Sequence, residues 1–229
     1  MVFEYGRRAV AKVPFPSTPD SWIRHESVYA DAVHACGAPV PQLRGLETIE
    51  GRTVSVWDYV DGDSLWASVS QGRFTPESAG DLLAGLHATL LSIVAPVSLP
   101  RQRDRLVCKV RRSPASMSPS TALLVDTLVS GETGLCHGDF HPGNVLLSDS
   151  GPMVIDWFDA CRGELMGDVA RTAVLLAPES ELAHLPGAAA PVVRALRDRY
   201  LEAMGVAPDR TEGWQDWLAI TQVAQAGEG

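Results

Sequence analysis

The segment at 135–147, LCHGDFHPGNVLL, is the feature that most constrains this chain. It contains two His, one Asp, one Asn, two Gly and one Pro between apolar flanks. Residues this polar and this prone to turns normally form surface loops. The flanks at 135–136 and 145–147, however, are typical of buried strands. The pattern therefore predicts a polar loop that core strands hold at both ends.

A second apolar stretch follows twelve residues after Asn144, where MVIDWFDA reads as a strand ending at Asp156. Two short strands on either side of a turn pair antiparallel. Their ends would bring Asp139, Asn144 and Asp156 to one small site. Two carboxylates and an amide oxygen are hard ligands, which suit Mg²⁺ better than Zn²⁺.

Two alternatives remain open for this segment. In the first, Asp139 and Asn144 only cap the turns of a β-hairpin, which is common for these residue types. The apolar strand that ends in Asp156 argues against that alternative. In the second, His137 and His141 bind a metal, but no third ligand follows at suitable spacing.

Length and composition indicate a soluble globular protein. The chain has 229 residues, of which 45% are hydrophobic and 21% charged. This length allows one large domain or two small ones. No apolar run approaches the roughly 20 residues of a membrane helix, and the first residues lack the apolar core of a signal peptide. We therefore expect no membrane partner and a cytoplasmic location.

The net charge of −9 is unevenly distributed. Residues 131–229 contain 15 acidic and 6 basic residues, whereas residues 1–130 contain 13 of each. This distribution argues against nucleic acid as a partner. A cationic small molecule or metal ions would suit such a field. For most of these charges, ordinary acidic solubility is the favoured explanation.

The stretch at 101–112, RQRDRLVCKVRR, has six basic residues and one acidic residue. Such a run is typical of a solvated face. The less favoured alternative is that it lines the rim of an anion site. The four cysteines form no C-x-x-C pair, so we expect free thiols rather than a metal site.

Hydrophobic periodicity and turn residues predict the order of the elements. His87 lies near the apolar stripe of one helix, where we expect a packed, hydrogen-bonded side chain. Two lobes should join near residues 57–62. The expected elements are strands at 2–13 around a turn at Gly6, a helix at 21–36, strands at 43–49 and 52–60, and helices at 76–94, 120–130, 167–177, 190–204 and 212–226.

Together these motifs resemble the aminoglycoside phosphotransferase and choline kinase group, which has a protein-kinase-like fold. The resemblance rests mainly on two segments, HGDFHPGNVLL and the following VIDWFDACRGELMGDVAR. H-G-D-x-x-x-x-N is similar to the kinase catalytic loop, and I-D-W stands where kinases have their metal-binding Asp. V-A-K at 10–12, R-H-E at 24–26 and VWDYVDGDSL resemble the phosphate-binding strand, its partner helix and the hinge. The similarity runs from about 8 to 175.

The resemblance implies an α+β, bilobal protein-kinase-like fold. Residues 1–60 would form a small, β-rich, nucleotide-binding lobe. Residues 61–229 would form a larger, mostly helical lobe with the catalytic loop and the acceptor-binding helices. Only eleven residues precede Lys12, and they contain no G-x-G-x-x-G. We therefore expect an N-truncated small lobe without the usual first strands and phosphate-covering loop.

The resemblance also implies roles in the catalytic block. Asp139 would be the catalytic base. Asn144 and Asp156 would bind Mg²⁺. His137 and Asp168 would support the loop from behind.

Further roles are implied in the small lobe. Lys12, oriented by Glu26, would contact the phosphates of ATP or GTP. The backbone around Trp57, Asp58 and Tyr59 would bind the edge of the purine.

The expected activity is transfer of the γ-phosphate of ATP or GTP to a hydroxyl of a small molecule. The loop has HGD instead of H-R-D and no A-P-E segment follows, which points away from protein acceptors. The acceptor would be an aminoglycoside or another antibiotic, consistent with a cationic compound. The alternatives are a catalytically impaired kinase-like nucleotide-binding protein and a metal-dependent hydrolase. The sequence does not indicate an oligomeric state.

Overall fold

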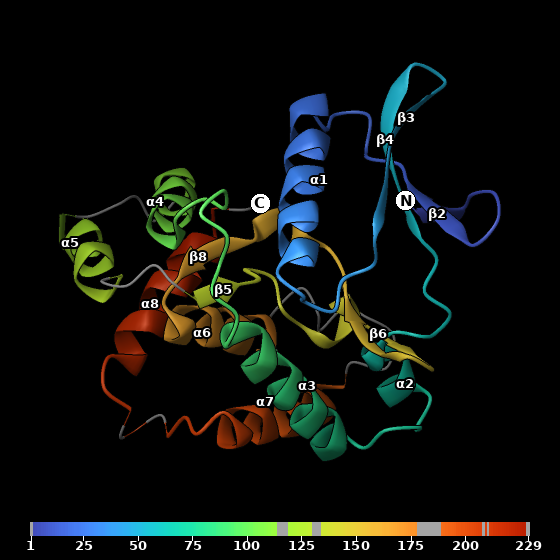
Figure 1. The fold of residues 1–229 in the computed structure, drawn as a ribbon. Helices are drawn as coiled ribbons and strands as arrows, with labels where there is room; N and C mark the ends of the chain where they lie inside the picture. Colours follow the sequence, from blue (N-terminus) through green and yellow to red (C-terminus); the bar gives the residue numbers. More distant parts are fainter. Residues whose placement is uncertain are drawn as a thin grey trace.

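The computed structural model describes residues 2–113, 119–129, 134–177, 189–207, 209 and 211–227. It has a small strand-rich part and a larger helical part (Figure 1). The strand-rich part contains one antiparallel sheet in the order β1-β2-β4-β3. Its strands are β1 (Val2–Glu4), β2 (Ala9–Lys12), β3 (Leu43–Ile49) and β4 (Arg52–Asp58).

Helix α1 (Asp20–Ala35) lies between this sheet and the helical part, as Figure 1 shows. Its buried face carries Ile23, Ala30 and Val33 at helical spacing. Glu26 lies on the same face and is almost as buried. A carboxylate at a core-facing position requires a partner, because burying an unpaired charge is costly.

The helical part begins after the second strand pair. α3 packs against α7, while α4 and α6 both pack against α8. The helices are α2 (Leu65–Ser70), α3 (Pro76–Leu91), α4 (Gln102–Arg112), α5 (Pro119–Leu128), α6 (Leu165–Leu175), α7 (Ala190–Ala203) and α8 (Trp214–Gln225).

Short strands and turns sit between these helices. β5 (Gly134–Cys136) pairs with β8 (Cys161–Gly163), and β6 (Val145–Ser148) pairs with β7 (Gly151–Val154). Two single turns of 3₁₀-helix, η1 (Pro142–Asn144) and η2 (Trp157–Asp159), connect them. The antiparallel pairing of 145–148 with 151–154 confirms the hairpin that the sequence predicts.

Most of the predicted elements are confirmed. The strand region at 2–13 divides into β1 and β2 around Gly6. The cap of α3 is as expected, because the Thr75 hydroxyl accepts a hydrogen bond from Ser78 N–H at 3.2 Å and Pro76 occupies the first turn. The basic run at 101–112 forms a helix, α4, to which the sequence assigned no structure. The predicted helix end at residue 130 lies outside the described residues.

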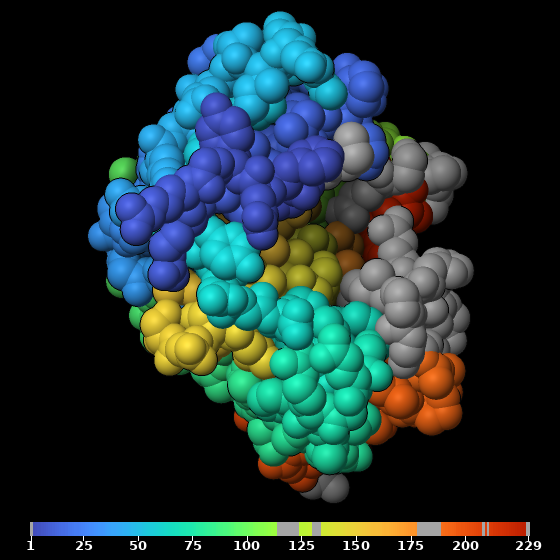
Figure 2. Space-filling view, turned by 90° about the vertical axis from the view of Figure 1, so that its right-hand side faces the viewer, coloured from blue at the N-terminus to red at the C-terminus, as the bar shows by residue number. Residues whose placement is uncertain are grey.

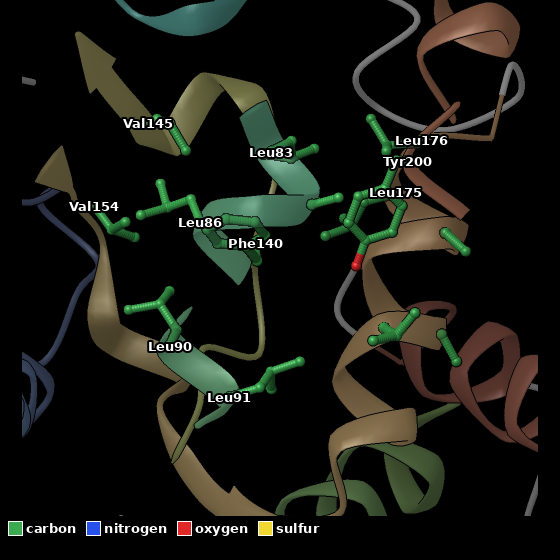
Figure 3. Close-up of a cluster of buried hydrophobic side chains, with 14 of the residues drawn as sticks. Leu83, Leu86, Leu90, Leu91, Phe140, Val145, Val154, Leu175, Leu176 and Tyr200 are labelled. Atoms are coloured by element: carbon green, nitrogen blue, oxygen red, sulfur yellow. The ribbon is translucent and has the colours of Figure 1, made fainter. Parts of the chain in front are cut away.

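The main core explains how a polar loop can sit between buried strands. Phe140, within the loop, has no exposed surface. Its ring lies among Leu83 and Leu86 of α3, with Tyr200 of α7 close by (Figure 3). The residue after Asp139 therefore anchors the loop in the core, while polar neighbours stay available for other contacts.

The two parts of the molecule share packing. A small cluster of Ala9, Val54 and Val56 forms the interior of the sheet. Val33, in α1, and Val40, in the segment before β3, belong instead to the main core. The division into domains at 1–60 and 61–229 stays a prediction.

Among the described residues, no helix is long and apolar enough to cross a membrane. All four cysteines are free thiols. Cys36 and Cys108 are exposed, whereas Cys136 and Cys161 are buried.

Candidate active site

The loop after β5 presents Asp139 at the wall of a cavity of about 360 Å³, which Lys12 and Asp156 also line. Gly138 makes the preceding turn with φ of +80°, a conformation that favours glycine. A Cβ at this position would lie 2.5 Å from the carbonyl oxygen of Asp159. The glycine of the HGD motif therefore allows the loop to approach η2 closely.

The buried carboxylate of Asp168 holds the main chain of this loop. Its Oδ2 accepts a hydrogen bond from His137 N–H at 2.7 Å, and its Oδ1 accepts one from Gly138 N–H at 2.8 Å. His87 Nε2 lies 3.1 Å from Oδ2, and His87 Nδ1 lies 2.6 Å from the Tyr200 hydroxyl. Burial would raise the pKa of Asp168, but the hydrogen bond and charge of His87, with the hydrogen bond from Gly138 N–H, hold it below its usual value.

These contacts also settle the predicted state of His87. It has no exposed surface and two hydrogen-bonding partners. The expectation of a packed, hydrogen-bonded histidine is therefore confirmed. Its position connects α3 to α6 and α7 directly behind the loop.

His137 supports the loop from the other side. Its Nδ1 accepts a hydrogen bond from Asp139 N–H at 3.2 Å, and its Nε2 donates to the carbonyl oxygen of Ile155 at 3.0 Å. These two contacts require the neutral ring with its proton on Nε2. Burial lowers the pKa of His137, which favours the same neutral form. With both ring nitrogens engaged, His137 is not available for the alternative histidine metal site.

The lowered pKa of His137 predicts a loss of stability in mild acid. The unfolded chain takes up a proton at this residue below about pH 6.5, but the folded chain resists it. The stabilisation is complete above that pH and is lost as the pH falls towards the lower folded pKa. We expect urea midpoints to fall between pH 7.5 and 5.5. His137→Gln should flatten this dependence and His25→Gln, at an exposed position, should not; equal slopes in all three chains would contradict the assignment.

Three side chains orient the carboxylate of Asp139. Arg171 Nη2 lies 3.6 Å from Oδ1, and His141 Nε2 lies 3.7 Å from Oδ2. Asn144 Nδ2 donates to Oδ2 at 3.2 Å and to the main-chain oxygen of Asp139 at 3.0 Å. Burial would raise the pKa of Asp139, but His141, with help from Arg171, brings it well below its usual value. Asp139 is therefore an ionised hydrogen-bond acceptor at neutral pH.

The sequence analysis assigned no role to Arg171, yet it contacts the loop twice. Its Nε also donates to the carbonyl oxygen of Gly138 at 3.1 Å. The sequence spacing could have indicated this contact, because Arg171 follows Asp168 by three residues and lies on the same face of α6. His141 was considered only as a metal ligand. Its Nδ1 instead accepts a hydrogen bond from Gly143 N–H at 3.1 Å and caps η1.

Lys12 connects the two parts of the molecule. Its Nζ lies 2.6 Å from Glu26 Oε1 and 3.0 Å from Asp156 Oδ1. Burial would lower the pKa of Lys12, but the charges of Asp156 and Glu26 raise it overall, so the ammonium form is favoured. Burial also raises the pKa of Glu26. The structure thus brings three of the predicted site residues into one ion cluster.

Asp156 adopts the left-handed conformation, with φ of +66° and ψ of +61°. This conformation is costly for a residue with a Cβ and is concentrated at functional sites. The hairpin places Asp156 beside Asn144, since Val145 pairs with Val154 and Ile155 N–H donates to the Asn144 carbonyl oxygen at 3.0 Å. The strand ends therefore converge as the sequence predicts.

The fit of these residues to Mg²⁺ depends on how many protein ligands the ion needs. Within the described ranges, no group of three or more His, Cys, Asp or Glu side chains is arranged to hold a metal ion. Mg²⁺ usually takes only one or two carboxylates from the protein and completes its shell with water and phosphate oxygens. Asp156 and the amide of Asn144 fit that smaller requirement.

A second cavity, of about 200 Å³, lies on the other side of Lys12 and is mostly apolar. Figure 2 looks into the hollow between the blue strands and the teal segment around α2. Trp57, Asp58 and Tyr59 all line it. The Asp58 and Tyr59 N–H groups already donate to the carbonyl oxygens of Gln42 and Arg8. A purine here would therefore meet the carbonyl groups of this stretch, or the peptide after it.

Asp159 ends η2, three residues after Asp156, and two cations from α4 bind its carboxylate. Lys109 Nζ lies 2.8 Å from Oδ2, and Arg105 Nη1 lies 3.3 Å from Oδ1. Helix α4 is thus docked next to the loop of Asp139, which its sequence did not indicate.

The strand-rich part carries the Lys12–Glu26 pair, and Lys12 reaches across to Asp156 near the polar loop of Asp139, an arrangement like that of kinase-like folds. The model of the Phosphotransferase enzyme family matches residues 3–215, so the chain belongs to this family. The resemblance found in the sequence is confirmed. No curated protein sequence matches the chain significantly.

Solved structures of similar fold are aminoglycoside phosphotransferases. The chain is 19% identical to an aminoglycoside-3'-phosphotransferase of type VIII, with a TM-score of 0.57, over 96% of this chain and 84% of the other. It is 14% identical to APH(3'')-Id from Streptomyces rimosus, with a TM-score of 0.59, over 96% and 86%. Identities this low show a shared fold.

A third similar structure is a ternary complex of APH(2'')-IIa with streptomycin and ATP. It is 14% identical to the chain, with a TM-score of 0.53, over 96% of this chain and 77% of the other. APH(3'')-Id has also been solved with ADP and streptomycin. These ligands belong to those proteins.

Proposed function

We propose that this protein transfers the γ-phosphate of ATP or GTP to a hydroxyl of a small molecule in a Mg²⁺-dependent reaction. One observation carries the proposal. Lys12, from the start of the chain, lines the same cavity as Asp139 and Asp156, which come from the two loops at the β6–β7 hairpin. The family and the nucleotide complexes of the similar structures support the same activity.

Asp139 is the group that would meet the acceptor hydroxyl. Phosphoryl transfer passes through a loose transition state, so positioning matters more than strong basicity. As the acceptor oxygen bonds to the γ-phosphorus, the bond from phosphorus to the β–γ bridging oxygen breaks. The hydroxyl proton passes late to Asp139. The products are a phosphorylated acceptor and a nucleoside diphosphate.

The remaining predicted residues would position the nucleotide. Lys12, held by Glu26, would contact the phosphates nearer the nucleoside. Asn144 and Asp156 would hold Mg²⁺, which would supply positive charge to offset that of the phosphates. The apolar cavity beside Trp57 and Tyr59 would take the purine.

Residues 1–60 would bind the nucleotide and residues 61–229 would bind the acceptor, in line with the predicted domains. We place the activity in the cytoplasm, where nucleoside triphosphates are available. Aminoglycosides are the first acceptors to screen, because gentamicin and streptomycin are the ligands of similar structures. Transfer of labelled phosphate from ATP or GTP to a panel of hydroxyl compounds tests the proposal directly.

Replacing Asp156 tests the nucleotide half of the proposal. Asp156→Asn replaces the charged one of the two protein ligands by a neutral amide oxygen, so it should weaken Mg²⁺-dependent nucleotide affinity by at least about tenfold. Calorimetric titration of ATP and GTP with Mg²⁺ and with EDTA measures this. Asp149→Asn, on the exposed β6–β7 turn, is the matched control. Equal affinities with Mg²⁺ and with EDTA in the unmodified protein would refute the proposed metal dependence.

A further inference from the structure

A third cavity, of about 430 Å³, opens on the side of Asp139 away from the apolar cavity that Trp57 and Tyr59 line. It lies between α1, α4 and α6, and we call it the acceptor cavity. Asp139, Trp22, Phe158 and Asp159 line both this cavity and the one that contains Lys12. Its described lining residues are Trp22, His25, Tyr29, Arg105, Cys108, Lys109, Arg112, Asp139, Phe158, Asp159, Arg171, Leu175 and Gln225.

The described lining residues of the acceptor cavity have a net positive charge, whereas the whole chain has a net negative charge. Four guanidinium or ammonium groups and two carboxylates are among its described lining residues, an excess of two positive charges. Both carboxylates already have cationic partners. Arg105 and Lys109 share the single carboxylate of Asp159, and Arg171 faces Asp139. The described residues of this cavity therefore have a net positive charge, whereas the whole chain has a net charge of −9.

Arg112 supplies the most accessible of these charges. It lies in the last turn of α4, is exposed, and has no carboxylate partner among the described residues. Its guanidinium can therefore bind an external anion without breaking an existing ion pair. Arg111, its neighbour in the chain, is also exposed but does not line the cavity.

Aromatic rings form the apolar wall of the acceptor cavity. The rings of Trp22 and Phe158 lie 5.4 Å apart, and the Arg105 guanidinium lies 5.5 Å from the Tyr29 ring centre and 5.8 Å from that of Phe158. Such a wall suits a planar or largely apolar ligand body. A positive rim and an aromatic wall therefore occur in one cavity beside the candidate base.

Resting on the proposed function, we propose that the acceptor is a hydroxyl compound with an apolar or aromatic body and an anionic group, a carboxylate or a phosphate. Its anion would lie against Arg112 and Lys109 of α4, and its hydroxyl would reach Asp139. A polycationic aminoglycoside would place ammonium groups among like charges, which costs binding energy. The alternative raised for the 101–112 run, the rim of an anion site, is thus the one that the geometry supports.

Cys108 offers a test of the local potential that does not depend on catalysis. It lines the cavity and is exposed. In a Cys36→Ser chain it is the remaining exposed thiol. We compare its rates of reaction with an anionic sulfonatoethyl and a cationic trimethylammonioethyl methanethiosulfonate. The ratio of the two rates cancels differences in thiol exposure and ionisation.

We expect this ratio to favour the anionic reagent at Cys108 by at least about fivefold over the ratio at Cys36 in a Cys108→Ser chain, at low salt. Arg112→Gln should lower the ratio several-fold, whereas Arg111→Gln should change it far less. Equal ratios at Cys108 and Cys36 would overturn the proposal even if the enzyme is active. A larger effect of Arg111→Gln than of Arg112→Gln would also overturn it.

Acceptor kinetics provide a second test of the inference. The acceptors to compare are matched hydroxyl compounds that carry a carboxylate, a phosphate or no charge, together with gentamicin and streptomycin. Arg112→Gln should raise the KM of the anionic acceptors by about tenfold with little change in kcat, and the preferred compound distinguishes carboxylate from phosphate. Efficient aminoglycoside turnover with no effect of Arg112→Gln would overturn the inference but confirm the proposed function. Anion-selective labelling of Cys108 with no transfer to any acceptor would instead refute the proposed function.

Discussion

Asp139→Asn should reduce kcat for phosphate transfer by about 10²- to 10⁴-fold while nucleotide affinity changes less than about twofold. The amide keeps the shape of the side chain and can still contact Arg171 or Asn144 through its oxygen. It cannot accept the proton of the acceptor hydroxyl. Because the Asp139 carboxylate is not one of the proposed Mg²⁺ ligands, nucleotide binding should survive.

Single-turnover transfer of labelled phosphate measures the chemical step, and calorimetry measures nucleotide binding separately. Asp149→Asn serves again as the control, since this exposed carboxylate lies on the β6–β7 turn. Full turnover by Asp139→Asn would remove Asp139 from the catalytic role. A parallel loss of nucleotide affinity would assign Asp139 to nucleotide binding instead.

Asp168→Asn should destabilise the protein by about 3 to 5 kcal/mol, enough to threaten folding at 37 °C. The carboxylate accepts hydrogen bonds from two consecutive main-chain N–H groups, those of His137 and Gly138. An amide could accept one of them but would turn its own N–H donors towards the other. The His87 ring would also lose its charged partner. A shift of the urea midpoint measures this loss.

Asp81→Asn is the matched control for this prediction. Asp81 is also ion-paired, with Arg199 Nε 2.7 Å away, but both side chains are exposed. Surface pairs contribute little to stability, so the midpoint should hardly move. If the two variants have equal stability, Asp168 does not hold the loop in the way described.

The sequence predicted the convergence at the centre of the site because chain order sets it. The β6–β7 hairpin fixes which residues face each other at its two ends, so Asn144 and Asp156 must come together. Lys12 and Glu26 could be placed only through the family resemblance. No local rule joins a strand at residue 12 to a helix at residue 26 and then to Asp156.

The parts that sequence reasoning missed depend on tertiary packing. The run at 101–112 carries too many charges for its periodicity to reveal a docked helix, although Val110 and Gln102 are buried. The sign of charge at the acceptor cavity was missed for a related reason. A charge count sums over the whole chain, whereas the potential in a cavity depends on groups within about one Debye length. Most of the acidic excess lies elsewhere.

The hydrogen bonds behind the loop of Asp139 also determine when the candidate site can be completed during synthesis. His87 and Tyr200, joined at 2.6 Å, are 113 residues apart, and Asp168 lies between them in the chain. A nascent chain that ends before α7 already contains the whole HGD segment but lacks the Tyr200 hydroxyl behind it. Because the ribosome releases the chain from its N-terminus, this support is complete only after α7 has emerged. The hydrogen bonds that support the polar loop are thus completed only when Tyr200 is available, about 60 positions after the loop itself has been synthesised.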